Sequence, residues 1–531
     1  MSYIPRRDQS ICGNPEAVAS RNGDHAHLPS PSAQPAVVTI GPSKTLVWFR
    51  QDLRLTDNPA LVDAVEHGGA VIPVFILDDD TVGRWRPGAA AKWWLHHSLE
   101  ALTAALAQRG TRLILRRGPA AATLKALLAE TGATAVVWNR VYEPDSIARD
   151  TAVKQQLLAD GHTVSSHNGS LVREPWTLRT QSGGPFRVYT PFWKRYWADR
   201  GEIGPPLPTP SHLPAPDDWP ASDVLADWSL TPTAYDWSAG LRAAWTPGEA
   251  GATIRLADFL DRTVAAYDHG RDRPGANGTS RLSPHLHWGE ISPRQVWAAV
   301  TDRLAQGALD GHEGAVETFL KEIVWREFSY NLLYHFPKLP DDPLDGRFAQ
   351  FPWDQPANDA GGASPTLRAW QRGKTGYPIV DAGMRQLWHI GWMHNRVRMI
   401  VASFLIKHLL IPWQVGEAWF WDTLVDADLA SNAASWQWVA GCGADAAPYF
   451  RIFNPILQGE KFDPDGDYVR TWVPEIARLP NKYLHKPWEA PALAQTDAGV
   501  RLGVSYPHPI IDHKAARARA LSAYNQIKGA A

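Results

Sequence analysis

The sequence is short of cysteine and of long hydrophobic runs, and each shortage excludes a class of protein. Cys12 and Cys442 are the two cysteines among 531 residues, and their contexts are unrelated. They cannot build a disulfide framework or a cysteine-rich zinc site, which fits a reducing, cytoplasmic setting. No run of about 18 apolar residues occurs, and residues 1–43 lack the hydrophobic stretch of a secretory signal, so neither a membrane nor export is indicated.

The net charge is also small. Lysine and arginine number 53 and aspartate and glutamate 55, which gives a formal charge of −2 and a pI near 6.8. This balance argues against a protein that coats nucleic acid through bulk positive charge, and it leaves room for a local basic face. Hydrophobic residues at 44% and charged residues at 20% are ordinary for a globular protein, and the length predicts two or three domains.

Composition and periodicity divide the chain into four segments. Residues 1–43 are rich in Ser, Pro, Gly and Asn and are expected to form a disordered extension. Residues 44–171 alternate apolar runs with helical stretches, which predicts βαβ units and a doubly wound, Rossmann-like parallel sheet. Residues 172–251 are dense in proline and are expected to form a long ordered connector. Residues 252–531 repeat apolar side chains at i, i+3, i+4 and i+7, which predicts an all-helical domain.

The predicted fold class is therefore α/β followed by all-α. Strands are expected at 45–50, 71–77, 112–116 and 134–139, and a parallel sheet of this kind binds ligands at the carboxyl ends of its strands. Helices in the second half are expected at 252–268, 293–306, 315–336, 379–391 and 395–410. No metal site is predicted, since His394 has no partner at ligand spacing.

Tryptophan is in excess, with 26 in the chain. The segment DADLASNAASWQWVA (426–440) places Trp436 and Trp438 around one glutamine, directly after a run of small residues. Trp353, Trp413 and Trp436 lie in separate segments of the helical region, whereas Trp325 and Trp438 lie next to polar residues. Indoles at such positions are either core side chains, or electron donors and stacking faces for a nucleobase.

The loop NGTSRLSPHLHWGEIS (277–292) combines hydroxyls at Thr279, Ser280 and Ser283 with the cation Arg281. Small donors beside a fixed positive charge suit a phosphate or pyrophosphate, although a polar loop with helix caps explains the same letters.

Two helical segments carry further polar clusters. Glu322 and Trp325 lie three residues apart on one helix face and form either a buried functional pair or a boundary. The segment GWMHNRVRMIVASF (391–404) gathers basic and amide side chains at a helix start, which either holds phosphates or is a solvated end.

Seven motifs in order resemble the DNA photolyase and cryptochrome family, and the resemblance runs from about Thr45 to near the C-terminus. They are WFRQDLRLTDNPAL (48–61), GTSRLS (278–283), EIVWREF (322–328), KTGYPIVDAGMRQLW (374–388), GWMHNRVRM (391–399), DADLASNAASWQW (426–438) and DAAPYFRIFNP (445–455). The chain is most similar to bacterial class I-type photolyases of cyclobutane pyrimidine dimers. The resemblance implies an α/β antenna domain and a helical domain that buries a U-shaped flavin adenine dinucleotide (FAD).

The resemblance also implies the cofactor contacts. Positions that match those holding the phosphates and the ribityl chain are Tyr267, Thr279, Ser280, Arg281, Leu282 and Ser283. Positions that match those around the isoalloxazine and ribose are Trp392, Arg398, Asp426 and Asp428, with Arg398 and Asp426 expected as a buried pair. Asn432 matches the position opposite flavin N5, where a neutral amide favours the reduced anionic flavin because it offers no acidic proton.

For electron transfer and substrate, the resemblance implies two separate groups of side chains. Trp436, Trp413 and Trp353 match a chain that carries an electron from the surface to the flavin. Trp438 matches an aromatic wall that faces Trp325 across a flipped-out lesion. Further positions that match lesion or DNA-backbone contacts are Glu322, Asn395, Met399, Arg271, Arg396, Arg451 and Gln458.

The implied reaction is light-driven splitting of cyclobutane pyrimidine dimers in UV-damaged DNA by a monomeric enzyme, with an electron lent by photoexcited reduced FAD. The alternatives are a cryptochrome photoreceptor, which would alter the residue at position 432, and a (6-4) photolyase, which would call for histidines where this chain has Asn395 and Met399. The antenna pigment is either methenyltetrahydrofolate or an 8-hydroxy-deazaflavin. Folate-binding members often carry Asn-Glu where this chain has Asp145 and Ser146, which puts the folate in doubt without establishing the deazaflavin.

Overall fold

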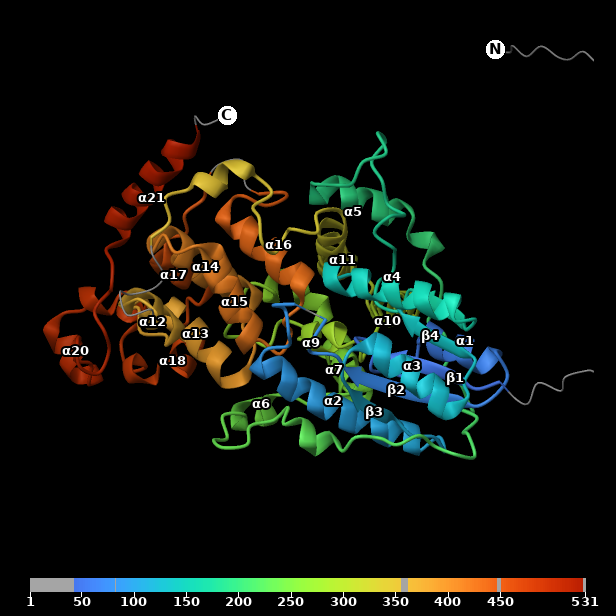
Figure 1. Cartoon of the computed structure of the whole chain (residues 1–531). Helices are drawn as coiled ribbons and strands as arrows, with labels where there is room; N and C mark the ends of the chain where they lie inside the picture. Colours follow the sequence, from blue (N-terminus) through green and yellow to red (C-terminus); the bar gives the residue numbers. More distant parts are fainter. Residues whose placement is uncertain (1–42, 82, 355–361, 447–449, 529–531) are drawn as a thin grey trace, which may run out of the picture. The chain divides into compact units, whose positions relative to one another are not determined.

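The computed structural model describes residues 43–81, 83–354, 362–446 and 450–528 (Figure 1). The predicted extension, apart from Ser43, lies outside these residues. Within them, all strands precede residue 168 and the rest of the chain is helices and loops, which confirms the predicted fold class of α/β plus all-α. None of the described helices is both long and apolar enough to span a membrane.

The N-terminal half forms a parallel five-stranded sheet in the order β3-β2-β1-β4-β5. The strands are β1 (Thr45–Phe49), β2 (Val71–Leu77), β3 (Ile114–Arg117), β4 (Ala135–Asn139) and β5 (Thr163–His167). Four of them were predicted, and β5 was missed because the sequence TVSSH has no apolar run and lies at the sheet edge with partly exposed side chains. The edge position explains why polar residues are tolerated there.

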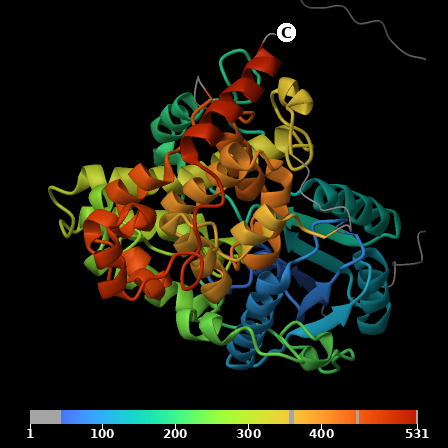
Figure 2. The same cartoon turned by 90° about the vertical axis from the view of Figure 1, so that its left-hand side faces the viewer.

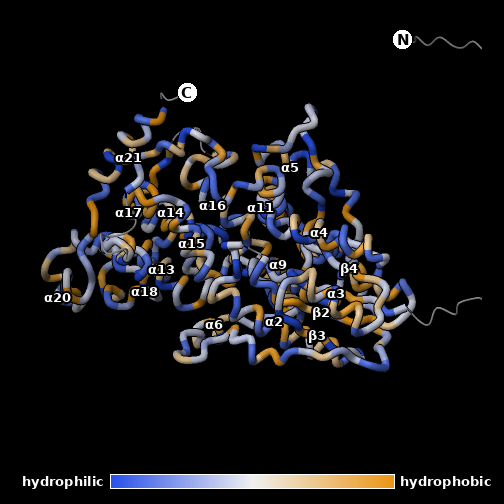
Figure 3. The backbone as a smooth tube through the Cα atoms, in the orientation of Figure 1, coloured by the Kyte–Doolittle hydropathy of each residue, from blue (hydrophilic) through white to orange (hydrophobic). Residues whose placement is uncertain are grey.

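Helices cover the sheet and bury its two faces in separate cores. They are α1 (Pro59–Glu66), α2 (Ala89–Ala107), α3 (Ala120–Thr131) and α4 (Pro144–Ala159). Along β1 the side chains alternate, so that Val47 and Phe49 enter one core while Leu46 and Trp48 enter the other. The tube around β2 and β3 is accordingly rich in hydrophobic residues (Figure 3).

Residues 172–251 contain four short helical elements and many prolines. The elements are α5 (Tyr189–Ala198), η1 (Arg200–Glu202), η2 (Leu225–Trp228) and α6 (Ala239–Ala244). Leu213, Trp228 and Leu230 are buried in the sheet-side core, so the segment is packed along the protein rather than free in solvent.

The C-terminal half is built from helices that pack against one another (Figure 2). Its α-helices are α7 (Glu249–Arg262), α8 (Tyr267–Gly270), α9 (Ser283–His287), α10 (Pro293–Ala305), α11 (Glu313–His335), α12 (Pro365–Gln371), α13 (Pro378–Ile390), α14 (Asn395–Ser403), α15 (Trp413–Thr423), α16 (Leu429–Ala440), α17 (Pro455–Phe462), α18 (Asp467–Trp472), α19 (Asn481–Leu484), α20 (Ala492–Ala498) and α21 (His513–Lys528). Short turns are η3 (Val264–Ala266), η4 (Gly346–Gln350), η6 (Pro474–Ile476) and η7 (Pro487–Glu489), and η5 (Phe404–His408) is a π-helical turn.

Two predicted helices are interrupted. The helix expected at 252–268 ends at Arg262, where the β-branched pair Thr263 and Val264 leads into a 3₁₀ turn before α8. The helix expected at 395–410 is α14 followed by the π turn η5, so the apolar periodicity continues although the hydrogen-bond spacing changes.

Arg54 holds the sheet and the helical half together. Its guanidinium is fully buried and donates to the carbonyl oxygens of Thr56 and Gly289 at 2.9 Å, and to those of Asp57 and Gly169 at 2.6 Å. Four carbonyls from three distant parts of the sequence therefore share one cation, which the planar five-donor geometry of arginine allows.

Glu290 makes a second connection of this kind from the helical side. Its buried carboxylate accepts hydrogen bonds from Trp94 Nε1 at 3.0 Å and from the backbone N–H of Gly248 at 2.7 Å. Ser98 Oγ and the ring of the equally buried His285 complete its shell. The carboxylate thus joins α2 and Gly248 to the C-terminal part of the predicted loop at 277–292.

Glu327 ties α11 to the start of the connector. Its carboxylate accepts the backbone N–H groups of Val172 and Arg173, both at 3.1 Å. Burial raises the pKa of this carboxyl to about 7, against the opposing effects of the Arg326 charge and the two N–H donors.

This pKa makes folding stability pH-dependent with a defined sign. In the unfolded chain a glutamate titrates near 4.3, so the contribution of Glu327 is fully present below about pH 4.3 and is lost as the pH rises through about 7. We expect denaturant titrations to show that Glu327→Gln removes about 4 kcal/mol of this pH dependence. Glu130→Gln, at an exposed pair with Arg116, should keep the wild-type slope; equal slopes for Glu327→Gln and wild type would contradict the assignment.

Candidate active site

The predicted phosphate loop lies against α8 through a contact between two glycines. A Cβ on Gly278 would lie 2.3 Å from the carbonyl oxygen of Gly270, so only glycine allows this approach. Within the loop, Thr279, Ser280 and Arg281 are partly buried, Leu282 is buried and Ser283 is exposed. The hydroxyls and the cation expected to hold phosphates are therefore gathered in one turn that precedes α9.

Arg281 fits an anionic ligand. Its backbone is in the left-handed region with φ at 50°, its guanidinium carbon is 5.1 Å from the centre of the Trp392 ring, and its Nε is buried without a hydrogen-bond partner among the described residues. Burial lowers its pKa, and no described carboxylate pairs with it. A partly buried cation with an unpartnered donor matches the pyrophosphate of FAD, so the residues present fit that cofactor.

Trp392, Arg398 and Asp426, which the motifs predict around the isoalloxazine and ribose, lie next to the phosphate loop. Trp392 donates through Nε1 to Ser283 Oγ at 3.2 Å, which connects the 391–399 segment to the phosphate loop. Arg398 donates to both carboxylate oxygens of Asp426, at 2.7 and 3.1 Å, and to the carbonyl oxygen of Met393 at 2.7 Å. The Asp426 side chain is only 2% exposed and that of Arg398 is 24% exposed, so the two form an ion pair with a buried carboxylate and a partly exposed cation.

Asp428 caps α16 and lies at the junction with α11. Its side chain accepts the backbone N–H of Ser431 at 2.7 Å and the hydroxyl of Tyr330. Burial alone would raise the pKa of this carboxyl, but the hydrogen bond from Tyr330, the nearby Arg326 charge and the proximity of His287 Nδ1 at 3.8 Å hold it well below its usual range. The carboxylate therefore stays ionised at the position expected for a ribose contact.

Asn432 and Trp436 follow on α16. Asn432 is buried and donates through Nδ2 to the carbonyl oxygen of Glu417 on α15 at 3.1 Å. Trp436 packs on Gly416, where a Cβ would lie 2.1 Å from the indole. The ring neighbours of Trp436 are Phe420 at 5.0 Å and Trp370 at 6.5 Å.

The other members of the expected tryptophan chain make no direct ring contact with Trp436. Trp413 begins α15 and is buried, and the ring of Trp353 packs on Phe351 at 4.3 Å. Sequence reasoning missed Phe420 and Trp370, since neither belongs to a motif that signals electron transfer.

Glu322 and Trp325, both on α11, contact different partners. Glu322 is ion-paired with Arg271 at 2.7 Å, and Trp325 stacks on Tyr189 of α5 with 3.6 Å between ring centres and 7° between planes. Tyr189 also donates to the carbonyl oxygen of Lys321 at 2.6 Å. Tyr189 lies in the connector, outside all seven motifs, and was missed for that reason.

The remaining lesion and DNA positions lie in different places. Arg271 and Arg396 lie near Glu322; Arg271 contacts the Tyr267 ring at 5.6 Å, and Arg396 pairs with Asp272 at 2.7 Å and makes a long contact with Met399. Trp438 and Arg451 instead line a small cavity of about 20 Å³ beside Lys407. Asn395 is exposed at the start of α14, and Gln458 lies on α17; neither joins another predicted site residue through a hydrogen bond among the described residues.

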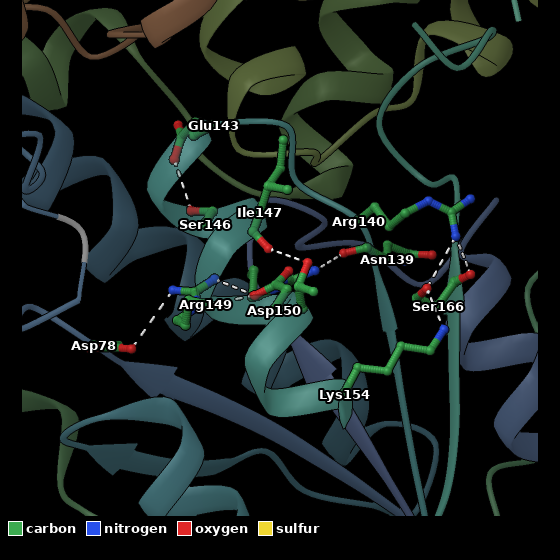
Figure 4. Close-up of polar contacts among 12 residues, drawn as sticks. Asp78, Asn139, Arg140, Glu143, Ser146, Ile147, Arg149, Asp150, Lys154 and Ser166 are labelled. Carbon is green, nitrogen blue, oxygen red and sulfur yellow. Dashed lines mark hydrogen bonds and ion pairs between the residues drawn. The ribbon is translucent and has the colours of Figure 1, made fainter. Parts of the chain in front are cut away.

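The region of the expected antenna pigment contains an internal polar network (Figure 4). Asp145 is exposed, whereas Ser146 is buried and donates to Glu143 at 3.3 Å. Arg149 lies between Asp150 at 2.9 Å and Asp78 at 3.8 Å. The hydroxyl of Ser146 therefore has its hydrogen-bond partner within the chain, and this contact does not identify the antenna pigment. The absorption spectrum of the purified protein distinguishes a folate from a deazaflavin.

Comparisons with known proteins agree with this geometry. Residues 45–211 match the family model of DNA photolyase, and residues 319–526 match the FAD binding domain of DNA photolyase. A deoxyribodipyrimidine photo-lyase of Agrobacterium fabrum is 55% identical over 92% of this chain and 99% of its own length. Cryptochrome-2 of Arabidopsis thaliana is 40% identical over 89% of this chain and 77% of its own length.

A crystal structure of a bacterial class III photolyase from Agrobacterium tumefaciens is 54% identical, covers 93% of this chain and 100% of that chain, and superposes with a TM-score of 0.87. A five-stranded parallel sheet joined to a helical FAD-binding region defines the photolyase and cryptochrome class. The chain belongs to the DNA photolyase family. The predicted family is confirmed, and the similar solved structure is described as class III, whereas the motifs suggested a class I-type enzyme.

Removing one member of the Arg398–Asp426 pair should destabilise the site strongly. Arg398→Met leaves a buried carboxylate without its cation, and we expect the free energy of unfolding to fall by about 3 kcal/mol, the lower end of the usual range because Arg398 is partly exposed. The double variant Arg398→Met/Asp426→Leu should regain most of this loss. Denaturant titration of both variants checks the expectation, and a double variant as unstable as the single one would contradict it.

Proposed function

We propose that the protein is a light-driven DNA repair enzyme that splits cyclobutane pyrimidine dimers in UV-damaged DNA. When bound, reduced FAD supplies an electron under blue light, and the chain's own residues hold the lesion and set the polarity around it. In the dimer the two bonds that join the pyrimidines break, and both bases are restored without net oxidation. We further propose a monomer that acts in the cytoplasm, a setting that the scarcity of cysteine supports.

The observation that carries the proposal is the position of Glu322. This partly buried carboxyl lies three residues from the stacked indole of Trp325 and within hydrogen-bond distance of Arg271. Flat aromatic surface suits a flipped-out pyrimidine dimer, and one acid beside it suits a pyrimidine carbonyl on which negative charge develops. A damaged pair is also cheaper to unstack than an intact one, which favours selection of the lesion.

The cationic side chains around this position support a DNA substrate. Arg271 and Arg396 flank Glu322, and Arg451 is exposed beside the cavity that Trp438 lines. A few phosphate contacts of this kind give useful affinity, and they need no basic pI. Asn395 and Met399 stand where a (6-4) photolyase would call for histidines, which favours cyclobutane dimers as the lesion.

Replacing Glu322 tests its role in repair. We expect Glu322→Ala to lower the quantum yield of dimer splitting several-fold while changing the affinity for UV-irradiated oligonucleotides much less, because the contact between the carboxyl and the dimer carbonyl strengthens as negative charge develops on that carbonyl during the reaction. Glu317→Ala, on the exposed face of the same helix, is the control and should change neither quantity. A loss confined to binding would argue against this placement of Glu322, and flavin binding without any light-dependent repair would point to a cryptochrome.

Replacing Trp436 separates electron supply from repair. We expect Trp436→Phe to abolish light-driven reduction of the bound flavin, since phenylalanine is a much poorer electron donor than indole. Repair by chemically reduced enzyme should be largely intact. The matched control is Trp388→Phe, because Trp388 is 63% exposed and stacks on Trp419 rather than on Trp436. Equal loss of both activities in Trp436→Phe would refute the assignment.

A further inference from the structure

Two arginines expected to bind the DNA backbone are already paired with carboxylates in the protein itself. Arg271 Nη1 lies 2.7 Å from Glu322 Oε1, with the two side chains 23% and 26% exposed. Arg396 donates through Nη2 at 2.7 Å and through Nε at 3.1 Å to Asp272 Oδ1. An arginine in such a pair cannot give its full charge to a phosphate until the carboxylate is released or neutralised.

The two pairs differ in what their carboxylates are for. Asp272 lies two residues after the end of α8 and has no expected role with the lesion. Glu322 is the acid proposed to contact the pyrimidine carbonyl, and in the ion pair its carboxylate is a hydrogen-bond acceptor. A pyrimidine carbonyl is an acceptor as well, so an ionised Glu322 would repel the group that it is proposed to bind.

The surroundings of Glu322 favour its neutral form once Arg271 is removed. The charged and titratable groups that face it are Arg271, Asp272, Arg396, Tyr189 and Tyr267. Burial raises the pKa of the Glu322 carboxyl and Asp272 adds to this, while Arg271 is the strongest opposing influence and Arg396 a weaker one. Both tyrosines have pKa values raised by burial, so they remain neutral and supply no charge.

We propose that Arg271 is a substrate-operated latch on Glu322. In the free protein the latch holds Glu322 as a carboxylate. A phosphate of the lesion-bearing strand takes over the guanidinium, and the released carboxylate takes up one proton from solvent to become a carboxylic acid. The O–H of that acid then donates to the dimer carbonyl. Arg271 is thus a positioning residue that acts through Glu322, and the inference rests on the repair function proposed above.

The latch couples lesion binding to uptake of one proton, which has a measurable sign. This dependence holds at pH values between the pKa of Glu322 in the free protein and its higher pKa in the complex. In that range the affinity for the lesion should fall tenfold for each unit that the pH rises. Undamaged DNA of the same sequence does not place a pyrimidine dimer against Glu322, so its affinity should lack this one-proton dependence.

The test measures protonation and affinity on the flavin-loaded full chain. Infrared difference spectra report the C=O stretch of a protonated carboxylic acid, assigned by its loss in Glu322→Gln. In the wild type we expect the band to appear only when a UV-irradiated oligonucleotide is added. In Arg271→Gln it should be present without DNA, with its titration midpoint raised by about 1 to 3 pH units, and the pH dependence of lesion affinity should disappear.

Arg396→Gln is the matched control, since it removes a neighbouring arginine that is also ion-paired. It should weaken DNA binding as a lost phosphate contact does, yet keep the acid band dependent on DNA. The latch is overturned if the wild type shows the band without DNA, if DNA never elicits it, or if Arg271→Gln titrates like the wild type. Dimer splitting by the wild type, measured in parallel, separates these outcomes from failure of the repair function itself, which absence of light-dependent splitting would show.

Discussion

The buried hydrogen bonds of Arg54 and Glu290 are the constraint on which the rest of the structure depends. Arg54 joins carbonyls of the first strand's loop, the end of β5 and the segment before Ser292, and Glu290 joins α2 to the residues after the phosphate loop. The loop at 278–283 and α9 therefore lie between Gly270 on one side and, on the other, the buried hydrogen bonds of Arg54 and Glu290, here called the polar seam. Because each partner would be costly to leave unpaired in a dry interior, the seam fixes the position of the cofactor site relative to the sheet.

Much of this architecture could be predicted because short stretches of sequence show the apolar runs of buried strands or the apolar period of helices. The strands β1 to β4 are apolar runs, and α10, α11 and α13 keep a 3.6-residue apolar period over many turns. The edge strand β5 has neither signal, since its side chains are only half covered. The end of the helix at Arg262 depends on two β-branched residues whose effect a periodic pattern does not register.

The site shows the same division between short-range and long-range information. Arg398 and Asp426 could be matched as a pair because each lies in a motif. Arg271 and Glu322 were each assigned a role, but 51 positions separate them and Arg271 lies outside all seven motifs, so no motif indicates an ion pair between them. Tyr189 reaches Trp325 from a proline-rich segment without period, and Phe420 and Trp370 meet Trp436 only after three helices have packed. Such contacts follow from tertiary packing, which single-sequence patterns do not contain.

The hydrogen bond from Asn432 to the backbone of Glu417 has a consequence for ligand chemistry. Rotating the Asn432 amide by 180° would bring its oxygen against the carbonyl oxygen of Glu417. The backbone of Glu417 therefore determines that the Nδ2 end of Asn432 makes the hydrogen bond within the protein. The remaining end of Asn432 is an acceptor. The Asn432 oxygen would accept a hydrogen bond from a ring N–H placed beside it and would gain none from an unprotonated ring nitrogen. The main-chain carbonyl of Glu417, on a different helix, thus decides which protonation form of a neighbouring ring Asn432 would favour.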